Sequence, residues 1–365
     1  MFERSYWLGF SQVPNVGPTR FAKLLSHFGS AENAWHASEK ELLPVIKPAL
    51  TAQFLDFRKK FFIVDYEKKL RHKKCWYVTL DDNNYPQLLK QIKNPPFVLF
   101  TKGKFSFNDS ENQLTIGVVG TRKITDYGRQ VTELLTRELV DAGAVIVSGL
   151  ALGVDSVAHA TTLEAKGKTI AVLGCGIDCC SPSENGQLYD RIVANGGVIV
   201  SEYGLGMSPT VGSFPSRNRI IAGLSLGVLV TEGAADSGAL ITAKDALENS
   251  RKVFAVPGPV TSSLSQGPYQ LIKQGAVVVS SAKEILDELG IPTSPFGLRG
   301  ASKSIKGDSK EEQKILDLLA EQDVHFDELV KRTKIDSSKL GTILSMMEMK
   351  GMIQTMSAGF FSLPR

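Results

Sequence analysis

Short apolar runs alternate with amphipathic stretches between residues 114 and 290, and this alternation constrains the fold more than any other feature. The runs are continuously apolar, as is typical of parallel strands buried on both faces. We expect strands at 115–119, 144–147, 169–173, 198–200, 227–230, 253–256 and 276–279. Helix patterns lie between them at 127–142, 154–165 and 239–248. The sequence therefore predicts an α/β core, a Rossmann-like parallel sheet with helices on both faces.

The regions around this core, which we assign to residues 114–290, differ from it in pattern. Residues 1–80 place apolar side chains at helical spacing and predict an N-terminal all-α domain. Residues 81–113 predict a connector that packs on the core, and the stretch from Tyr77 to Gly103 predicts short extended pieces within it. Residues 291–310 are rich in Pro, Gly and Ser, a composition typical of a flexible linker. Residues 311–365 predict three helices and a hairpin, the pattern of a winged-helix-like domain.

Composition excludes several classes of protein. Four Cys in 365 residues are too few for a disulfide scaffold and suit a reducing compartment. The sequence has no apolar run of the roughly 20 residues that cross a bilayer, and its first residues do not form a secretory signal pattern. We therefore expect a cytoplasmic protein that makes no membrane contact.

The positive charge of the chain is concentrated near its N-terminus. Residues 1–75 contain 13 Lys and Arg against 7 Asp and Glu, whereas the rest of the chain contains 29 against 31. Basic runs at 58–60 and 68–74 carry much of this surplus. One interpretation is a solvated helix face, and the other is a surface that meets a polyanion.

Glycine-rich loops follow the predicted strands of the core. Gly120-Thr121-Arg122 follows the first strand, and Gly149 follows the second. Ligands of open α/β sheets lie beyond the carboxyl ends of the strands, where glycine admits a ligand to the backbone and helix N-termini attract anions. The sequence therefore predicts a phosphate-bearing ligand at this edge of the sheet.

Nucleotide-binding and catalytic motifs are missing from the sequence. Gly174-Cys175-Gly176 lacks the third glycine of a dinucleotide fingerprint, and no G-x-x-x-x-G-K-[ST] pattern occurs. The core contains one histidine, His159, and its cysteines lack metal-ligand spacing. We therefore expect no cofactor, no metal and no enzymatic activity, with His159 as a packing residue.

Arg217, Asn218 and Arg219 lie near the start of a predicted helix. Guanidinium groups match phosphate oxygens in bidentate fashion, so the two arginines are candidates for ligand contact. In the structural alternative, at least one of them pairs inside the domain with Glu202 or Glu232.

Three acidic residues of the core, Asp155, Glu202 and Glu232, leave two interpretations open. They could support general acid–base chemistry, or they could orient arginines and backbone groups, which is the interpretation we favour. A further expectation concerns Ser237, which is placed to cap the helix after the strand at 227–230.

Residues 13–17, with the sequence VPNVG, are close to the hairpin of a helix-hairpin-helix motif. Asn15 replaces the first glycine of that hairpin. Asn adopts left-handed backbone conformations more readily than most residues, so the turn is compatible with this sequence. A plain helical connector is the alternative.

In their order along the chain, the core motifs resemble those of the DNA-processing protein A family, also called DprA or Smf. The matching segments are VGTR at 119–122, SGxAxGVDxxxH at 148–159, AVLGxGxD at 171–178, SEY at 201–203, FPxRNRIIAGLS at 214–225, SGxLITA at 237–243 and VFAVPG at 253–258. The resemblance implies a Rossmann-like core, an N-terminal domain of sterile-alpha-motif or helix-hairpin-helix type, and a C-terminal winged helix.

The resemblance also implies a function. Such proteins bind and protect single-stranded DNA, help to load the RecA recombinase past single-strand-binding protein, serve natural transformation and recombination, and form homodimers through the core. The implied DNA-binding residues are Gly120, Thr121, Arg122, Gly149, Gln187, Phe214, Arg217, Asn218, Arg219, Ser237, Gly238 and Thr242, supported by Asp155, Glu202 and Glu232.

This sequence departs from the family pattern at some positions. Gln187 stands where a basic residue is expected, and Gly233 follows Glu232 where the family has alanine. Residues 313–365 hold 7 Lys and Arg and 7 Asp and Glu, a balance that leaves DNA contact and protein contact equally open. Two alternative functions remain. One is a Rossmann-like nucleoside-monophosphate hydrolase of the lysine-decarboxylase-like type, and the other is a structural hub with a vestigial pocket.

Overall fold

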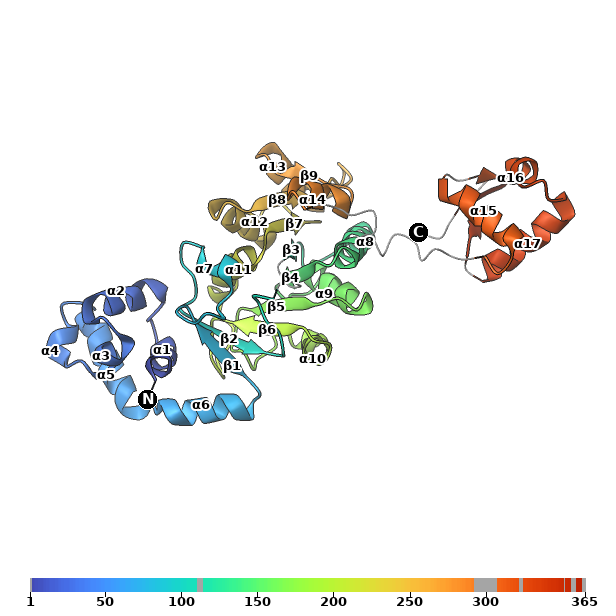
Figure 1. Cartoon of the computed structure of the whole chain (residues 1–365). Coiled ribbons are helices and arrows are strands. Elements are labelled where there is room, and N and C mark those ends of the chain that lie inside the picture. Colours follow the sequence, from blue (N-terminus) through green and yellow to red (C-terminus); the bar gives the residue numbers. More distant parts are fainter. Residues whose placement is uncertain are drawn as a thin grey trace. The chain divides into compact units, whose positions relative to one another are not determined.

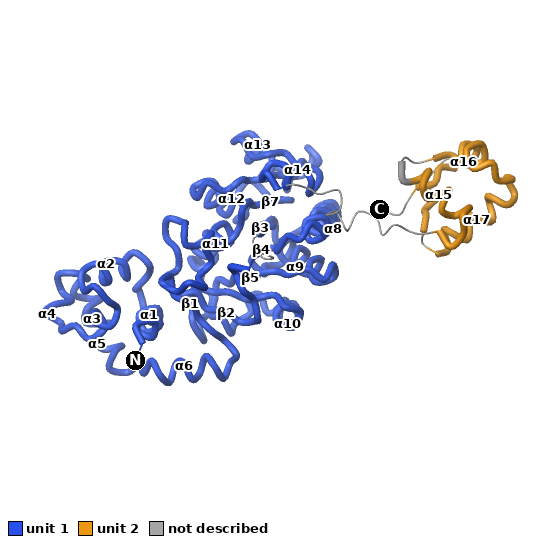
Figure 2. Tube along the Cα trace, viewed as in Figure 1, with its two compact units in different colours: residues 1–298 blue, residues 299–365 orange. Residues whose placement is uncertain are grey.

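The computed structural model describes residues 2–109, 114–291, 307–321, 324–350, 352–355 and 359–362. It divides into two compact units, residues 1–298 and 299–365 (Figure 2). Most of the linker expected at 291–310 falls on residues 292–306, which lie outside the described residues. No helix in the described ranges combines the length and the apolar character needed to cross a bilayer.

A sheet runs through the middle of the larger unit (Figure 1). Its strand order is β1-β2-β6-β5-β4-β3-β7-β8-β9, and neighbours from β6 to β9 in this order are parallel. The parallel strands are β3 (Thr115–Val119), β4 (Val145–Ser148), β5 (Thr169–Leu173), β6 (Val198–Ser201), β7 (Gly227–Val230), β8 (Lys252–Ala255) and β9 (Val277–Val278). Each expected strand forms, with bounds that differ by at most one residue at either end. The predicted Rossmann-like sheet is confirmed.

The segment expected to be a connector contributes a short helix and a strand, α7 (Gln87–Lys90) and β2 (Val98–Lys102). A further strand, β1 (Trp76–Thr79), lies at the end of the region expected to be all-α, so that expectation was wrong for its last residues. Strand β2 pairs with β6 in antiparallel fashion, and β1 pairs with β2. This segment therefore extends the sheet at one edge rather than only packing on it. The physical reason is that β6 would otherwise leave its backbone N–H and C=O groups unpaired.

Helices cover both faces of the sheet. On one face lie α8 (Asp126–Asp141), α9 (Val154–Glu164) and α14 (Ala282–Glu288), and on the other lie α7, α11 (Ser213–Leu224), α12 (Gly238–Glu248) and α13 (Gln266–Lys273). Successive strand residues serve opposite cores. Ile146 packs with the first set of helices, whereas Val145 and Val147 pack with the second. This two-sided burial explains why the strands are apolar at every position.

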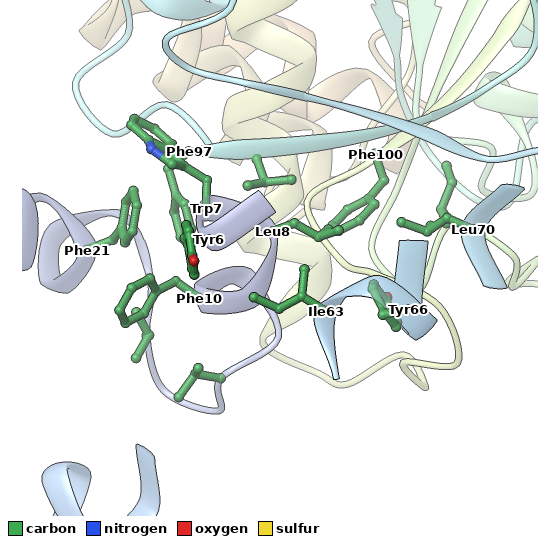
Figure 3. Close-up of a cluster of buried hydrophobic side chains, with 14 of the residues drawn as sticks. Tyr6, Trp7, Leu8, Phe10, Phe21, Ile63, Tyr66, Leu70, Phe97 and Phe100 are labelled. Carbon is green, nitrogen blue, oxygen red and sulfur yellow. The ribbon is translucent and has the colours of Figure 1, made fainter. Parts of the chain in front are cut away.

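The N-terminal helices share a core with the sheet. They are α1 (Glu3–Ser11), α2 (Pro18–Phe28), α3 (Ala31–His36), α4 (Glu39–Leu42), α5 (Pro48–Lys60) and α6 (Ile63–His72). Their buried side chains pack with those of β2, β6 and α10 (Gly186–Ala194) in one continuous cluster. Figure 3 shows Phe21 beside Phe97, and the two rings stack with centroids 4.1 Å apart.

Two local details of this region bear on the sequence patterns. The apolar residues at helical spacing over 54–64 lie in two helices and the turn between them, since α5 ends at Lys60 and α6 begins at Ile63. Asn15, in the turn between α1 and α2, has φ +65°, the left-handed conformation that the hairpin requires. The turn therefore forms despite the missing glycine.

The described residues of the smaller unit form three helices and a small sheet. Its elements are α15 (Lys310–Glu321), β10 (Val324–His325), α16 (Phe326–Thr333), α17 (Ser337–Met349), β11 (Gln354–Thr355) and β12 (Phe360–Ser362). The strand order is β10-β12-β11, with antiparallel neighbours. Ile315 of α15, Leu329 of α16 and Leu344 of α17 meet in a separate core. This is the arrangement expected of a winged helix.

The stacked pair Phe21 and Phe97 generates a prediction about stability. Phe21 is 1% exposed, so Phe21→Ala removes a ring from the core that joins α2 to the sheet. We expect a loss of about 3–5 kcal/mol in the free energy of unfolding, measured by urea denaturation. Phe62→Ala is the matched control, because Phe62 is 68% exposed and its loss costs under about 0.5 kcal/mol. Equal losses in both variants would contradict the shared core.

Candidate functional site

A cavity of about 730 Å³ opens at the carboxyl edge of the parallel strands. It lies where the chain order of the strands reverses, since β4 to β6 continue to one side of β3 and β7 to β9 continue to the other. Such a switch point leaves the crevice in which α/β sheets bind ligands. The predicted DNA-binding residues that line it are Gly120, Thr121, Arg122, Phe214, Arg217, Asn218, Ser237, Gly238 and Thr242, and the predicted supporting residue Asp155 lines it as well.

The loop after β3 is packed tightly between its neighbours. The Thr121 amide donates to the Glu232 carbonyl at 2.8 Å, and the Val154 amide donates to the Thr121 carbonyl at 3.1 Å. A Cβ at Gly120 would lie 2.6 Å from Val154 Cγ2 and 2.7 Å from the Glu232 carbonyl oxygen. Glycine at position 120 therefore lets three loops converge at the floor of the cavity.

Arg217 lies beneath the cavity rather than in its mouth. The residue is 5% exposed, and its Nη1 donates to the Val172 carbonyl of β5 at 2.9 Å. A Cβ at Gly149 would lie 1.5 Å from Nη1, so the absence of a side chain there makes room for the guanidinium. Burial lowers the pKa of Arg217, the charge of Asp155 opposes this, and the charge of Arg122 adds to it. Arginine stays protonated all the same, so the site holds a buried positive charge.

Asp155 provides the nearby negative charge. Its Oδ2 accepts hydrogen bonds from the amides of Gly149 at 3.1 Å and Ala151 at 3.3 Å. Burial raises the pKa of Asp155, while Arg217 and these amides oppose the rise. The carboxylate thus fixes the loop between β4 and α9 beside the guanidinium.

Arg219 turns away from the cavity. Its Nη2 donates to both carboxylate oxygens of Glu202, at 2.6 and 2.5 Å. The expected pairing of one arginine with Glu202 is therefore present. Arg219 lies two positions after Arg217 on α11, so the two side chains face different directions. Arg219 is therefore not among the residues that line the cavity.

Glu232 is equally occupied inside the protein. Its carboxylate accepts from the Thr125 amide at 3.0 Å and from the Thr125 hydroxyl at 2.6 Å. A Cβ at Gly128 would lie 2.0 Å from Oε2, so the first turn of α8 fits closely around this group. Glu232 is 2% exposed and anchors the start of α8.

The N-terminal end of α12 faces the cavity. Ser237 caps the helix, as expected, by accepting from the Ala239 amide at 3.3 Å. Asn218 Nδ2 donates to the Gly238 carbonyl at 3.2 Å and so links α11 to α12. Because Phe214 of α11 and Gly238 of α12 both line the cavity, the positive ends of two helix dipoles meet there.

Arg122 is the arginine available to a ligand. Its side chain is exposed, and its guanidinium carbon lies 5.5 Å from the centroid of the Phe214 ring. Neither a hydrogen bond nor an ion pair from this guanidinium reaches another described residue. A cation and an aromatic ring thus stand together at the mouth of the cavity.

Some predicted residues lie elsewhere, and some lining residues were missed. Gln187 is exposed near the start of α10, and it does not line the cavity. Pro209, Thr210 and Val211 do line it, and Val211 is 93% exposed. These three belong to the loop between β6 and α11, where Gly204-Leu205-Gly206 follows the strand and is a signal that could have pointed to them.

Metal-binding and nucleophilic groups are not assembled here. Among the residues that the structure describes, no three His, Cys, Asp or Glu side chains are placed to hold a metal ion. Cys175 donates to the Cys179 carbonyl at 3.2 Å. Burial and the neighbouring Cys179 raise the pKa of Cys175 to about 12, so its thiol stays protonated at neutral pH.

His159 is a fully buried residue behind the cavity. Its Nδ1 lies 2.7 Å from the Thr169 hydroxyl, which itself donates to the Ile146 carbonyl at 2.6 Å. Nδ1 therefore carries the proton of a neutral ring. Burial, with a contribution from the charge of Arg217, lowers the pKa of His159 to about 3. The ring packs as expected and remains neutral under physiological conditions.

Comparison with known proteins identifies the family. A family model described as DNA recombination-mediator protein A matches residues 76–290, and a DprA winged helix domain model matches residues 299–359. Protein Smf of Synechocystis sp. is 42% identical over 291 residues, which span 79% of this chain and 73% of that protein. DNA processing protein DprA of Bacillus subtilis is 46% identical over 212 residues, which span 58% of this chain and 70% of that protein.

Solved structures agree. DNA processing protein A from Streptococcus pneumoniae has a TM-score of 0.67 and 34% identity, covering 78% of this chain and 97% of that one. A structure of DNA processing protein A from Helicobacter pylori, which concerns that protein's single-stranded DNA binding mode, has a TM-score of 0.51 and 33% identity, covering 58% and 95%. The chain belongs to the DNA recombination-mediator protein A family, also known as DprA or Smf.

The pKa of His159 generates a prediction about pH. The unfolded chain takes up a proton near the ordinary pKa of 6.5, whereas the folded protein does so only near 3. The free energy of unfolding therefore falls as pH decreases below 6.5, by up to about 1.4 kcal/mol per pH unit from this group. Urea denaturation between pH 7 and 5 measures the slope. His159→Gln should flatten it, while the exposed His72→Gln should keep it. An unchanged slope in His159→Gln would refute the assignment.

Proposed function

We propose that this protein binds single-stranded DNA in the cavity between β3 and β7. The observation that carries the proposal is the exposed Arg122, placed at the mouth of a cavity into which two helix N-termini point. Membership of the DNA recombination-mediator protein A family and similarity to a structure concerned with single-stranded DNA binding support the same ligand class.

In this proposal the strand contacts the protein through its phosphates and one or more bases. Arg122 and the N-terminal ends of α11 and α12 attract phosphate oxygens without regard to sequence. Phe214 offers a ring on which a base stacks. Arg217, paired with Asp155, holds the floor of the cavity in place. Small groups and backbone come close to the ligand at Gly120, Thr121, Ser237, Gly238 and Thr242.

We propose a binding role rather than catalysis. The three carboxylates that could serve general acid–base chemistry are each held by protein groups: Asp155 by backbone amides, Glu202 by Arg219, and Glu232 by Thr125. The hydrolase alternative requires a free carboxylate beside the base and sugar. Release of free base from nucleoside monophosphates by the purified protein would favour that alternative over ours.

The proposal extends to partners. We propose a homodimer that passes its strand to the RecA recombinase in the presence of single-strand-binding protein, as part of transformation or recombination. Light scattering at micromolar concentration should give twice the mass of the chain. RecA ATPase activity on strand coated with single-strand-binding protein should begin earlier when this protein is added. A monomeric mass, or an unchanged lag in ATPase activity, would contradict the corresponding part.

Arg122→Ala is the sharpest test of the cavity. Because Arg122 is exposed, its loss should remove a phosphate contact without disturbing the fold. We expect binding to weaken about tenfold for any base sequence, and the slope of log affinity against log salt to fall by about 0.7. Fluorescence anisotropy with labelled oligothymidine and a mixed-sequence strand measures both quantities.

Arg137→Ala is the matched control for Arg122→Ala, because Arg137 is an exposed arginine of α8 that does not line the cavity. It should bind as the unmodified protein does. Arg217→Ala is a poorer test, since Arg217 also bonds to β5 and its loss affects folding. Unchanged binding by Arg122→Ala would exclude this cavity as the DNA site.

A further inference from the structure

Helix α6 carries exposed cations that the proposed cavity does not use. Lys69, His72 and Lys73 are all exposed; Lys69 lies in the last turn of α6, and Lys73 is the residue that caps its C-terminal end. The ion pairs near them join Lys68 to Asp65 and Lys60 to Asp56. Within the described ranges, neither Lys69 nor Lys73 has an acidic partner.

Three other side chains of α6 fix the helix to the body of the protein. Ile63, Tyr66 and Leu70 are buried in the core that the N-terminal helices share with the sheet (Figure 3). The Tyr66 hydroxyl accepts from the Leu205 amide at 2.7 Å. A Cβ at Gly204 would lie 2.1 Å from that hydroxyl. The helix is therefore seated directly on the loop between β6 and α11, and Lys69 and Lys73 lie beside Tyr66 at this junction.

A second cavity, of about 370 Å³, lies at this junction. Its lining residues are Tyr66, Lys69, His72, Lys73, Asp178, Leu205 and Gly206. Asp178 is the acidic member, and its Oδ1 accepts from the Gly206 amide at 2.8 Å. Two lysines therefore face one carboxylate that is already engaged by the backbone, and this balance favours an anionic ligand.

The two cavities share the loops that form them. In the loop after β6, Gly206 lines the second cavity and Pro209 lines the first. In the loop after β5, Asp178 lines the second and Ser181 lines the first. Three residues of extended chain span at most about 11 Å. A ligand that leaves the first cavity across either loop therefore reaches the lysines of α6 within a short distance.

We propose that Lys69 and Lys73 bind phosphates of the same single strand that occupies the first cavity, so that the strand crosses the two loops and continues along α6. This inference rests on the proposed function and assigns the N-terminal helices a part in it. The contacts are to the sugar-phosphate backbone, since ammonium groups on exposed stems bind phosphate without reading bases. Strand length, rather than sequence, then decides whether α6 is engaged.

The test compares oligothymidines of increasing length by fluorescence anisotropy at several salt concentrations. The variant is Lys69→Gln with Lys73→Gln, two exposed positions whose change leaves the buried face of α6 intact. For long strands, loss of two phosphate contacts should lower the salt slope by about 1.4 and weaken binding. For the shortest strand that binds the unmodified protein, affinity and slope should stay the same.

The matched control is Lys104→Gln with Lys166→Gln. It makes the same change in net charge at two exposed lysines, which follow β2 and precede β5 at the opposite edge of the sheet from both cavities. The control should bind strands of every length as the unmodified protein does. Thermal melts of both variants should match that of the unmodified protein, since no buried group is altered.

Each other outcome overturns the inference in a distinguishable way. If the α6 variant binds long strands with an unchanged slope, the strand does not reach α6, although the cavity assignment stands. If the variant weakens the binding of short and long strands alike, or if the control weakens binding as much, the lysines act through general charge and do not contact the strand along α6. If the unmodified protein binds no single strand, the inference and the proposed function fail together.

Discussion

The buried guanidinium of Arg217 is the constraint on which the site depends. A charged group 5% exposed is costly to bury, and here it is balanced by the nearby charge of Asp155 and by a hydrogen bond to the carbonyl of Val172. These partners come from different parts of the sheet, and Gly149 must lack a side chain for the group to fit. The loop after β4, strand β5 and helix α11 are thereby fixed relative to one another, and their positions determine the shape of the cavity.

The polar groups around that buried charge fall into two sets, those that bond inside the protein and those that remain open to solvent. Glu202 bonds to Arg219, and Glu232 bonds to Thr125. These internal bonds set the starts of helices and the spacing of loops. Arg122 is left exposed at the mouth. If the cavity binds a strand as proposed, these internal bonds hold its donors in place before the strand arrives, which is what preorganisation of a site means.

The sequence predicted the sheet well, because strands such as β4 and β5 are buried on both faces and read as continuous apolar runs. It predicted short extended pieces around β2 but not that β2 joins the sheet. That pairing depends on the need of β6 for a partner, a long-range effect that no local pattern records. Within the site, Ser237 and the pairing of Glu202 followed from local chemistry. The direction of Arg219 follows from its helical spacing after Arg217, but Gln187 was placed by resemblance alone, and it lies on α10 outside the cavity.

The six N-terminal helices lie outside the family model that matches residues 76–290, yet they share one core with β2, β6 and α10. Without these helices, buried side chains such as Phe97 and Phe100 would be exposed to solvent. The helices are thus not a detachable module. Any relative built without them must carry polar side chains on that face or cover it in another way, so the gain or loss of this region in evolution required coordinated changes in the sheet itself.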